Sequence, residues 1–277
     1  MKTIISKRLR NGIAIMVLTG AWVAAVPVEA EVKSQPIHDS VTLSDDTVIE
    51  RMDIVSGGYN HGSGLYAIGS KYNRQNPMQV NTNGHQLAIR LNEKSGMPQL
   101  AGIFLENNIA MNVDTGNNKL LVSVLSQDTK GVNGIKVSAY NRLHIKGNVE
   151  IGGIHSEGSS AGGIAFQSGG SEIVIDGSLK INDVRGAEEG KKARSKGIGI
   201  YGISLTGTDT KMAVNGTVDI SGVKGSSLTT SGEDSEISIG GGSISAAEDS
   251  DKSHNYYAVF IEKGTVCLLY TSDAADE

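Results

Sequence analysis

The sequence predicts an all-β chain wound as a parallel β-helix, and three observations support this fold class. Three segments share one pattern, in which apolar residues alternate on both sides of a glycine: GIKVSAYNRLHIKGNVEI from Gly134, GIAFQSGGSEIVIDGSLKI from Gly163 and GISLTGTDTKMAVNGTVDI from Gly202. Alternating apolar stretches continue outside these segments, and no long stretch shows a helical period. Repetition every few tens of residues predicts stacked coils, each adding short strands to the same walls.

The glycine in the middle of each segment marks the expected corner of a coil. Gly147, Gly177 and Gly216 each lie between two pairs of alternating apolar residues. Alternation is the period of a strand, so these apolar side chains point to one face. A glycine between two such strands predicts a bend that a side chain would crowd. A fourth and poorer copy, from Ile237 to Ile244, fits only with one inserted residue.

The outward positions of the repeats predict columns of side chains. If equivalent strands stack, two columns form: Glu150, Lys180 and Asp219 in one, and Lys146, Asp176 and Asn215 in the other. The signs of the charges alternate along the first column. Opposite charges on neighbouring strands are favourable, so the signs support the register derived from the glycines.

The chain of 277 residues divides into four expected segments. Residues 1–30 have a basic start, an apolar run and small residues at a cleavage position, and they are typical of a secretory signal peptide. An uncleaved membrane anchor is the alternative. Residues 31–83 are rich in turn signals and predict a less regular N-terminal cap, and residues 84–266 predict the β-helix itself.

The last segment, residues 267–277, departs from the repeat pattern. It reads CLLYTSDAADE, which resembles the translation of an adapter used in sequencing libraries. We therefore expect it to be a non-native tail and the natural protein to continue beyond Val266. A genuine acidic tail is the alternative.

Composition excludes several classes of function. Residues 31–266 contain neither Cys nor Trp, which excludes a disulfide framework, thiol catalysis and cysteine-based metal sites. The net charge of the whole chain is only −5, which argues against nucleic acid or an anionic membrane surface as the main partner.

Together, the signal peptide, the absence of cysteine and the repeats from Gly134 to Ile220 resemble the passenger domains of bacterial type V autotransporters. The resemblance implies a right-handed parallel β-helix, exported to the cell surface, the outer membrane or the medium of a Gram-negative bacterium. It also implies a C-terminal membrane barrel, which would follow Val266, so the chain would be an N-terminal passenger fragment. Passengers of this family include adhesins, proteases, esterases and toxins, so the resemblance does not choose among activities.

Catalytic motifs are weak in this sequence. His61, in YNHGSG, is the best single catalytic candidate, but paired carboxylates are missing around it, and the adjacent pair Asp45-Asp46 lies in the irregular lead-in. We therefore expect His61 to be an ordinary loop histidine. The run from Gly158 to Gly162 resembles a serine-protease motif only in its glycines and serines, so we expect a flexible turn there.

Metal and cofactor sites are not predicted either. The glycine-rich stretches lack the aspartate spacing of calcium-binding solenoids. Glu248, Asp249 and Asp251 are the best candidates for weak calcium binding, but we expect a solvated acidic loop there. We expect no metal and no cofactor.

The best candidates for ligand contact lie in one basic insertion. The loop GAEEGKKARSKG begins at Gly186, and its cations and the tyrosine that follows form the expected ligand-contact set: Lys191, Lys192, Arg194, Lys196 and Tyr201. Loops on solenoids often carry binding, and a tyrosine ring can stack on a sugar. A mobile solvated loop, with Tyr201 packed on the core or an edge, is the alternative.

The sequence therefore favours a non-enzymatic, adhesin-like scaffold that binds a host-surface protein or a glycan. A polysaccharide lyase or hydrolase on the same fold is the first alternative. A passive stalk, with the functional part elsewhere in the protein, is the second.

Overall fold

The computed structural model describes residues 31–33, 35–55, 61–68, 71–94, 96–127, 129, 131–157, 160–186, 199–245 and 257–268. Strands account for all the regular structure in these ranges, and nothing in them forms a helix long and apolar enough to cross a membrane. The predicted signal peptide, residues 1–30, lies outside the described residues.

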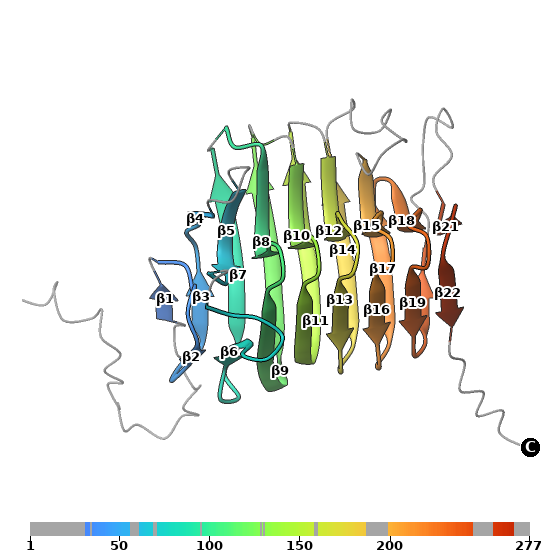
Figure 1. The fold of residues 1–277 in the computed structure, drawn as a ribbon. Helices are drawn as coiled ribbons and strands as arrows, with labels where there is room; N and C mark the ends of the chain where they lie inside the picture. Colours follow the sequence, from blue (N-terminus) through green and yellow to red (C-terminus); the bar gives the residue numbers. More distant parts are fainter. Residues whose placement is uncertain are drawn as a thin grey trace, which may run out of the picture.

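Two hydrogen-bonded sheets form the molecule (Figure 1). The larger has 14 strands: β1 (Glu31–Lys33), β2 (Val41–Thr42), β3 (Thr47–Ile49), β6 (Met78–Asn81), β7 (Leu87–Glu93), β9 (Ala110–Ser126), β11 (Arg142–Ser156), β13 (Glu172–Ile175), β14 (Leu179–Arg185), β16 (Lys211–Val214), β17 (Val218–Val223), β19 (Glu236–Ile239), β20 (Gly242–Ile244) and β22 (Thr265–Leu268). The smaller, which we call the eight-stranded sheet, has eight: β4 (Asp53–Val55), β5 (His61–Tyr66), β8 (Gln99–Leu105), β10 (Gly131–Val137), β12 (Ser160–Phe166), β15 (Ile200–Leu205), β18 (Ser226–Thr230) and β21 (Val259–Ile261).

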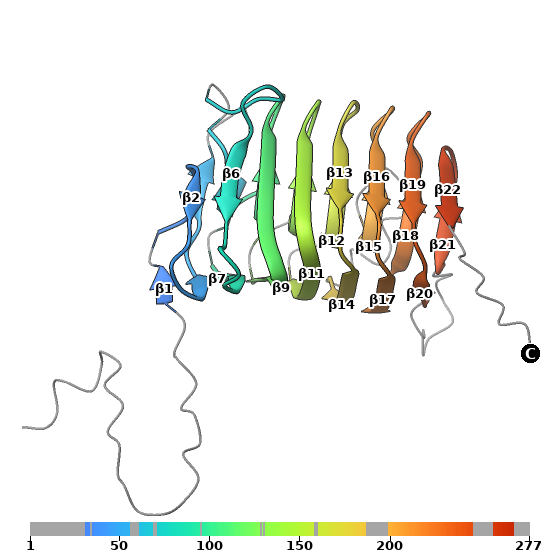
Figure 2. The same cartoon turned by 90° about the horizontal axis from the view of Figure 1, so that it is seen from below.

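From β8 onward the chain alternates between the two sheets, and all pairs there are parallel. The larger sheet is bent into two halves: β13 pairs with the first part of β11, before Gly147, and β14 pairs with the second part. Each coil therefore contributes to three walls, and the coils follow one another in a row from β1 to β22 (Figures 1 and 2). This arrangement is a parallel β-helix and confirms the predicted fold class.

The apolar residues of the repeats fill the space between the walls. Leu143 and Ile145 come from the first half of β11, Ile151 comes from its second half, and Ile135 comes from β10; all four are completely buried. Equivalent residues of the next coils continue the same columns, as Ile145 pairs with Ile175 and Ile175 with Val214. The inward columns predicted from the sequence are therefore the core.

The predicted register and the charge column through Glu150 are also confirmed. Glu150 pairs with Lys180, and Lys180 pairs with Asp219. The carboxylate of Glu150 lies 3.3 Å from Lys119 Nζ on one side and 3.5 Å from Lys180 Nζ on the other. The fourth copy of the repeat joins the same walls, but the expectation of an inserted residue is wrong: Val214 pairs with Ile239 and Val218 with Gly242, so the fourth copy is one residue shorter at this corner.

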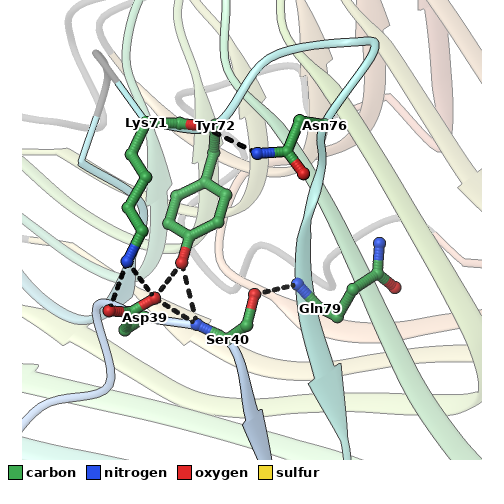
Figure 3. Close-up of polar contacts among 6 residues, drawn as sticks. All are labelled: Asp39, Ser40, Lys71, Tyr72, Asn76 and Gln79. Carbon is green, nitrogen blue, oxygen red and sulfur yellow. Dashed lines mark hydrogen bonds and ion pairs between the residues drawn. The ribbon is translucent and has the colours of Figure 1, made fainter.

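The N-terminal part is less regular than the rest. Strand β4 runs antiparallel to β5 and forms one edge of the eight-stranded sheet. Figure 3 shows the contacts that fix the segment before β6: Lys71 Nζ donates to Asp39 Oδ1 at 2.8 Å, and the Tyr72 hydroxyl donates to the same carboxylate. Ser40 Oγ accepts from the backbone of Gln79 at 2.9 Å, so this cluster connects the lead-in to β6.

Strand β22 extends past the expected boundary at Val266. Its residues Cys267 and Leu268 pair with Ser238 and Ile239 of β19. The remainder of the segment that we expect to be a non-native tail, residues 269–277, lies outside the described residues.

Candidate ligand-binding face

Of the residues expected to contact a ligand, only Tyr201 lies within the described residues. Lys191, Lys192, Arg194 and Lys196 lie outside the described residues. Tyr201 lies in β15, on the outer face of the eight-stranded sheet, where it pairs with Gly162 of the neighbouring coil.

Tyr201 packs against this face. A Cβ atom added to Gly162 would lie 2.1 Å from Tyr201 Cε2, so the glycine makes room for the ring. The Tyr201 hydroxyl donates a hydrogen bond of 3.0 Å to Oδ1 of Asn133, which lies one coil further along the sheet. Burial raises the pKa of Tyr201 above its usual range. The ring is therefore part of a side-chain layer on the sheet.

The same layer continues with His61 and Phe104. Phe104 follows the core residue Ile103 in β8, so the alternation of the strand directs it outward. The imidazole of His61 stacks on the Phe104 ring with a centroid distance of 4.4 Å. The expectation that His61 lies in a loop is wrong: it begins strand β5 and is only 6% exposed, because its ring leans over the adjacent strand.

Lys136 is the most unusual member of this layer. It lies between the core residues Ile135 and Val137 of β10 and pairs with Phe104 of β8, so it shares the outer face. It is only 4% exposed, and it makes no hydrogen bond or ion pair within the described residues. A lysine is almost never buried to this extent without a partner, because removing its charge from water is costly.

The local electrostatics follow from this burial. Burial lowers the pKa of Lys136 to about 8, and the charge of Glu106 opposes this shift. Burial also lowers the pKa of His61 to about 4, helped by the positive charge of Lys136, so the imidazole is neutral at pH 7. Burial raises the pKa of the Glu106 carboxyl, and Lys136 acts in the opposite direction.

Two further polar atoms of this face have no partner among the described residues. His61 Nδ1 and Gln99 Oε1 are both enclosed and make no hydrogen bond. Their residues pair directly across β5 and β8, so the two side chains start from adjacent positions. Lys136 Nζ also has no partner, but it is not among the enclosed atoms, so it keeps some contact with solvent.

We call His61, Gln99, Phe104, Glu106, Asn133, Lys136 and Tyr201 the outer-face cluster. Of these residues, only His61 and Tyr201 were candidates from the sequence. An isolated lysine at an outward strand position is usually solvated, so the sequence carried no signal for Lys136. The arrangement provides one cation, a neutral imidazole, an amide oxygen and aromatic rings, which are groups that bind polar ligands with an apolar face.

The other polar clusters are internally satisfied. Asp39, in the cluster of Figure 3, has its pKa lowered by the hydrogen bond from Lys71 and then by the backbone of Ser40. Asp46 accepts a hydrogen bond of 2.8 Å from the backbone of Gln86 and lies 3.6 Å from His85 Nδ1. These carboxylates connect segments of the N-terminal coils to each other.

Within the described ranges, no three His, Cys, Asp or Glu side chains gather in a way that could hold a metal ion. The acidic stretch containing Glu248, Asp249 and Asp251 lies outside these ranges. A scan of the chain against models of protein families and searches among curated proteins and solved structures returned no match.

Proposed function

We propose that this chain is an exported, adhesin-like binding protein. In this proposal the β-helix is a rigid scaffold, of the kind found in autotransporter passengers, and the outer-face cluster holds a glycan or a host-surface protein. The scaffold part rests on the repeats, whose residues build the core, the corners and the charge columns. The binding part rests on the outer-face cluster, because its residues do not repeat from coil to coil.

The observation that carries the proposal is the contrast between the walls. On the larger sheet, outward side chains pair along the ladder: Glu150 lies between Lys119 and Lys180, and Arg142 Nε lies 3.4 Å from Glu172 Oε2. On the eight-stranded sheet, Lys136 is only 4% exposed and has no acceptor within the described residues, although its Nζ keeps some contact with solvent. A largely buried amine without a partner opposes folding, so its presence is better explained by a ligand than by the scaffold.

The first test is a binding screen. The full chain, without its predicted signal peptide, is immobilised and exposed to an array of glycans and to host-surface proteins. We expect saturable binding that the Lys136→Met variant loses and that Lys146→Met, a change of an exposed lysine on the larger sheet, keeps. If no glycan and no surface protein binds, the proposed function is wrong.

The second test concerns location. The complete reading frame is expressed in a Gram-negative host, and the intact cells are treated with a protease. We expect the chain to be cleaved from the cell surface or recovered in the medium. Retention in the cytoplasm would contradict the export on which the proposal depends.

A polysaccharide-cleaving enzyme is the second candidate, and one observation favours it. Lys136, His61 and Glu106 combine a lysine whose pKa is about 8, a neutral imidazole and a carboxyl whose pKa is raised by burial. Groups shifted in this way occur at sites of proton transfer. Release of reducing ends or of unsaturated products from a polysaccharide would establish this activity and replace the binding role.

A further inference from the structure

The unsatisfied groups of the outer-face cluster define what a ligand must provide. Lys136 is a cation that lacks an acceptor in the part of the chain that the structure describes. Gln99 Oε1 is an acceptor that lacks a donor, and His61 Nδ1 lacks a partner of either kind. A ligand that satisfies all three carries an anionic oxygen and also hydroxyl groups.

The aromatic members of the cluster add a second requirement. The stacked rings of His61 and Phe104 lie on the same face, and Phe104 pairs with Lys136 across the sheet. Phe104 and His61 are only 2% and 6% exposed, so a sugar packs its C–H face on Phe104 only after the imidazole of His61 turns away, and the polar groups beside the ring then bind the hydroxyls. The combination of an anionic oxygen, hydroxyls and an apolar face is found in a sugar acid.

We propose that Lys136, His61 and Gln99 form a binding site for the carboxylate and hydroxyl groups of an acidic sugar unit in a glycan. This inference rests on the proposed binding function and names the chemical class of its ligand. Lys136 Nζ, which keeps contact with solvent, meets the carboxylate first. The imidazole of His61 and the amide of Gln99 then turn toward the sugar, because side-chain rotation at a binding face is common.

The charge of Glu106 selects the kind of anion. Its carboxylate acts on Lys136 electrostatically, so it also repels an anion bound there. The repulsion grows with the charge of the ligand and disfavours a doubly charged phosphate more than a singly charged carboxylate. The site therefore favours a uronic acid over a phosphorylated ligand.

The test uses three probes with the full chain lacking only its predicted signal peptide. An oligogalacturonate, a neutral oligogalactan of the same length and inorganic phosphate are titrated calorimetrically at neutral pH. We expect the oligogalacturonate to bind at least about tenfold more tightly than either of the others, as the loss of a hydrogen bond to a charged group predicts.

Three variants locate the site. Lys136→Met and His61→Phe keep the size of each side chain, and Lys146→Met removes an exposed lysine on the larger sheet. We expect the first to weaken oligogalacturonate binding at least about tenfold and the second to weaken it several-fold, whereas Lys146→Met leaves it unchanged. We also expect Lys136→Met to raise the midpoint of thermal unfolding, because it removes a buried charge that lacks a partner.

The outcomes separate this inference from the proposed function. If glycans bind but neutral and acidic ones bind equally, the acidic-sugar site is wrong and the binding function stands. If phosphate binds as tightly as oligogalacturonate, the site is a general anion site and the inference is wrong. If Lys136→Met lowers the thermal midpoint and leaves binding intact, Lys136 is structural. If Lys136→Met does not fold, unchanged binding by a folded His61→Phe variant overturns the site.

Discussion

A Cβ atom on Gly177 would lie 2.4 Å from the carbonyl oxygen of Gly147 in the preceding coil. The same relationship recurs one coil later, where a Cβ on Gly216 would lie 2.7 Å from the carbonyl oxygen of Gly177. The corner between the two halves of the larger sheet is therefore a stack of backbone on backbone. No side chain fits without moving a neighbouring coil, and the backbone of that coil is held by its own ladder of hydrogen bonds.

The first prediction concerns this corner. Gly177→Ala should lower the free energy of unfolding by about 2–3 kcal/mol, because the added methyl group meets main-chain atoms that cannot rotate away. Urea unfolding, followed by far-ultraviolet circular dichroism, measures the change.

The matched control is Gly131→Ala. Its added Cβ would meet no atom closer than 3.3 Å, and the nearest one belongs to the side chain of Ser160. We expect this substitution to change the free energy of unfolding by at most about 1 kcal/mol in either direction, because alanine also restricts the unfolded chain. Equal losses for the two substitutions would mean that the corner does not demand glycine.

The second prediction concerns the charge column on the larger sheet. Glu150→Gln removes the shared partner of Lys119 and Lys180 and should lower the free energy of unfolding by roughly 0.5–1 kcal/mol at low salt. The loss should shrink in about 1 M salt, because screening weakens contacts between exposed charges. Urea titrations at two salt concentrations provide the comparison.

Glu157→Gln serves as the control for this column. Glu157 is exposed, and its side chain forms no ion pair within the described residues. We expect its substitution to change the free energy of unfolding by under about 0.5 kcal/mol at either salt concentration. A salt-independent loss in Glu150→Gln would show that packing, and not charge, explains the effect.

The sequence was sufficient to predict the structural features that repeat from coil to coil. Alternation placed Ile145 and Ile175 in the core, and the spacing of the glycines gave the register that joins Glu150 to Lys180. These predictions succeed because each depends on local periodicity and on the pattern that neighbouring coils share, and both can be recognised in the sequence.

The same reasoning from the sequence does not predict the outer-face cluster. Alternation shows that Phe104 and Lys136 point outward, but it does not show that the imidazole of His61 leans over Phe104. The burial of Lys136 and the pKa values of Lys136 and His61 depend on how side chains from different coils pack against each other. The glycine that accommodates the Tyr201 ring, Gly162, has a role of the same kind.

The third prediction concerns the pH dependence that Lys136 causes. Its pKa is lowered from 10.5 to about 8 in the folded chain by burial. Between these values the unfolded chain binds the proton more tightly, so the free energy of unfolding should rise as pH increases from about 8 to about 10.5. The full effect is at most roughly 3.4 kcal/mol, at 1.36 kcal/mol for each pH unit.

The Lys136→Met variant isolates this effect from other groups that titrate in the same range. We expect the variant to be more stable than the natural chain at pH 7 and the difference to narrow as the pH rises. Chemical denaturation at several pH values measures both. A difference that stays constant with pH would mean that the amine of Lys136 titrates normally in the folded chain.

The fourth prediction concerns the stability of the folded chain at acidic pH. Burial, with the charge of Lys136, lowers the pKa of His61 from 6.5 to about 4. Between pH 6.5 and pH 4 the unfolded chain gains a proton that the folded chain does not take, so stability falls as the pH decreases through this window. His61→Phe should remove this contribution and flatten the acid side of the stability profile.

The same substitution should also act at neutral pH, for a different reason. Phenylalanine retains the stack on Phe104 and leaves no unsatisfied Nδ1, so we expect a gain of about 1 kcal/mol in the free energy of unfolding. The control is His38→Phe, which changes an exposed ring stacked on Tyr66 at 5.7 Å and should shift stability by under about 0.5 kcal/mol. A loss of stability in His61→Phe at neutral pH would show that Nδ1 has a partner in the folded chain, and the ligand requirements inferred from it would then fail.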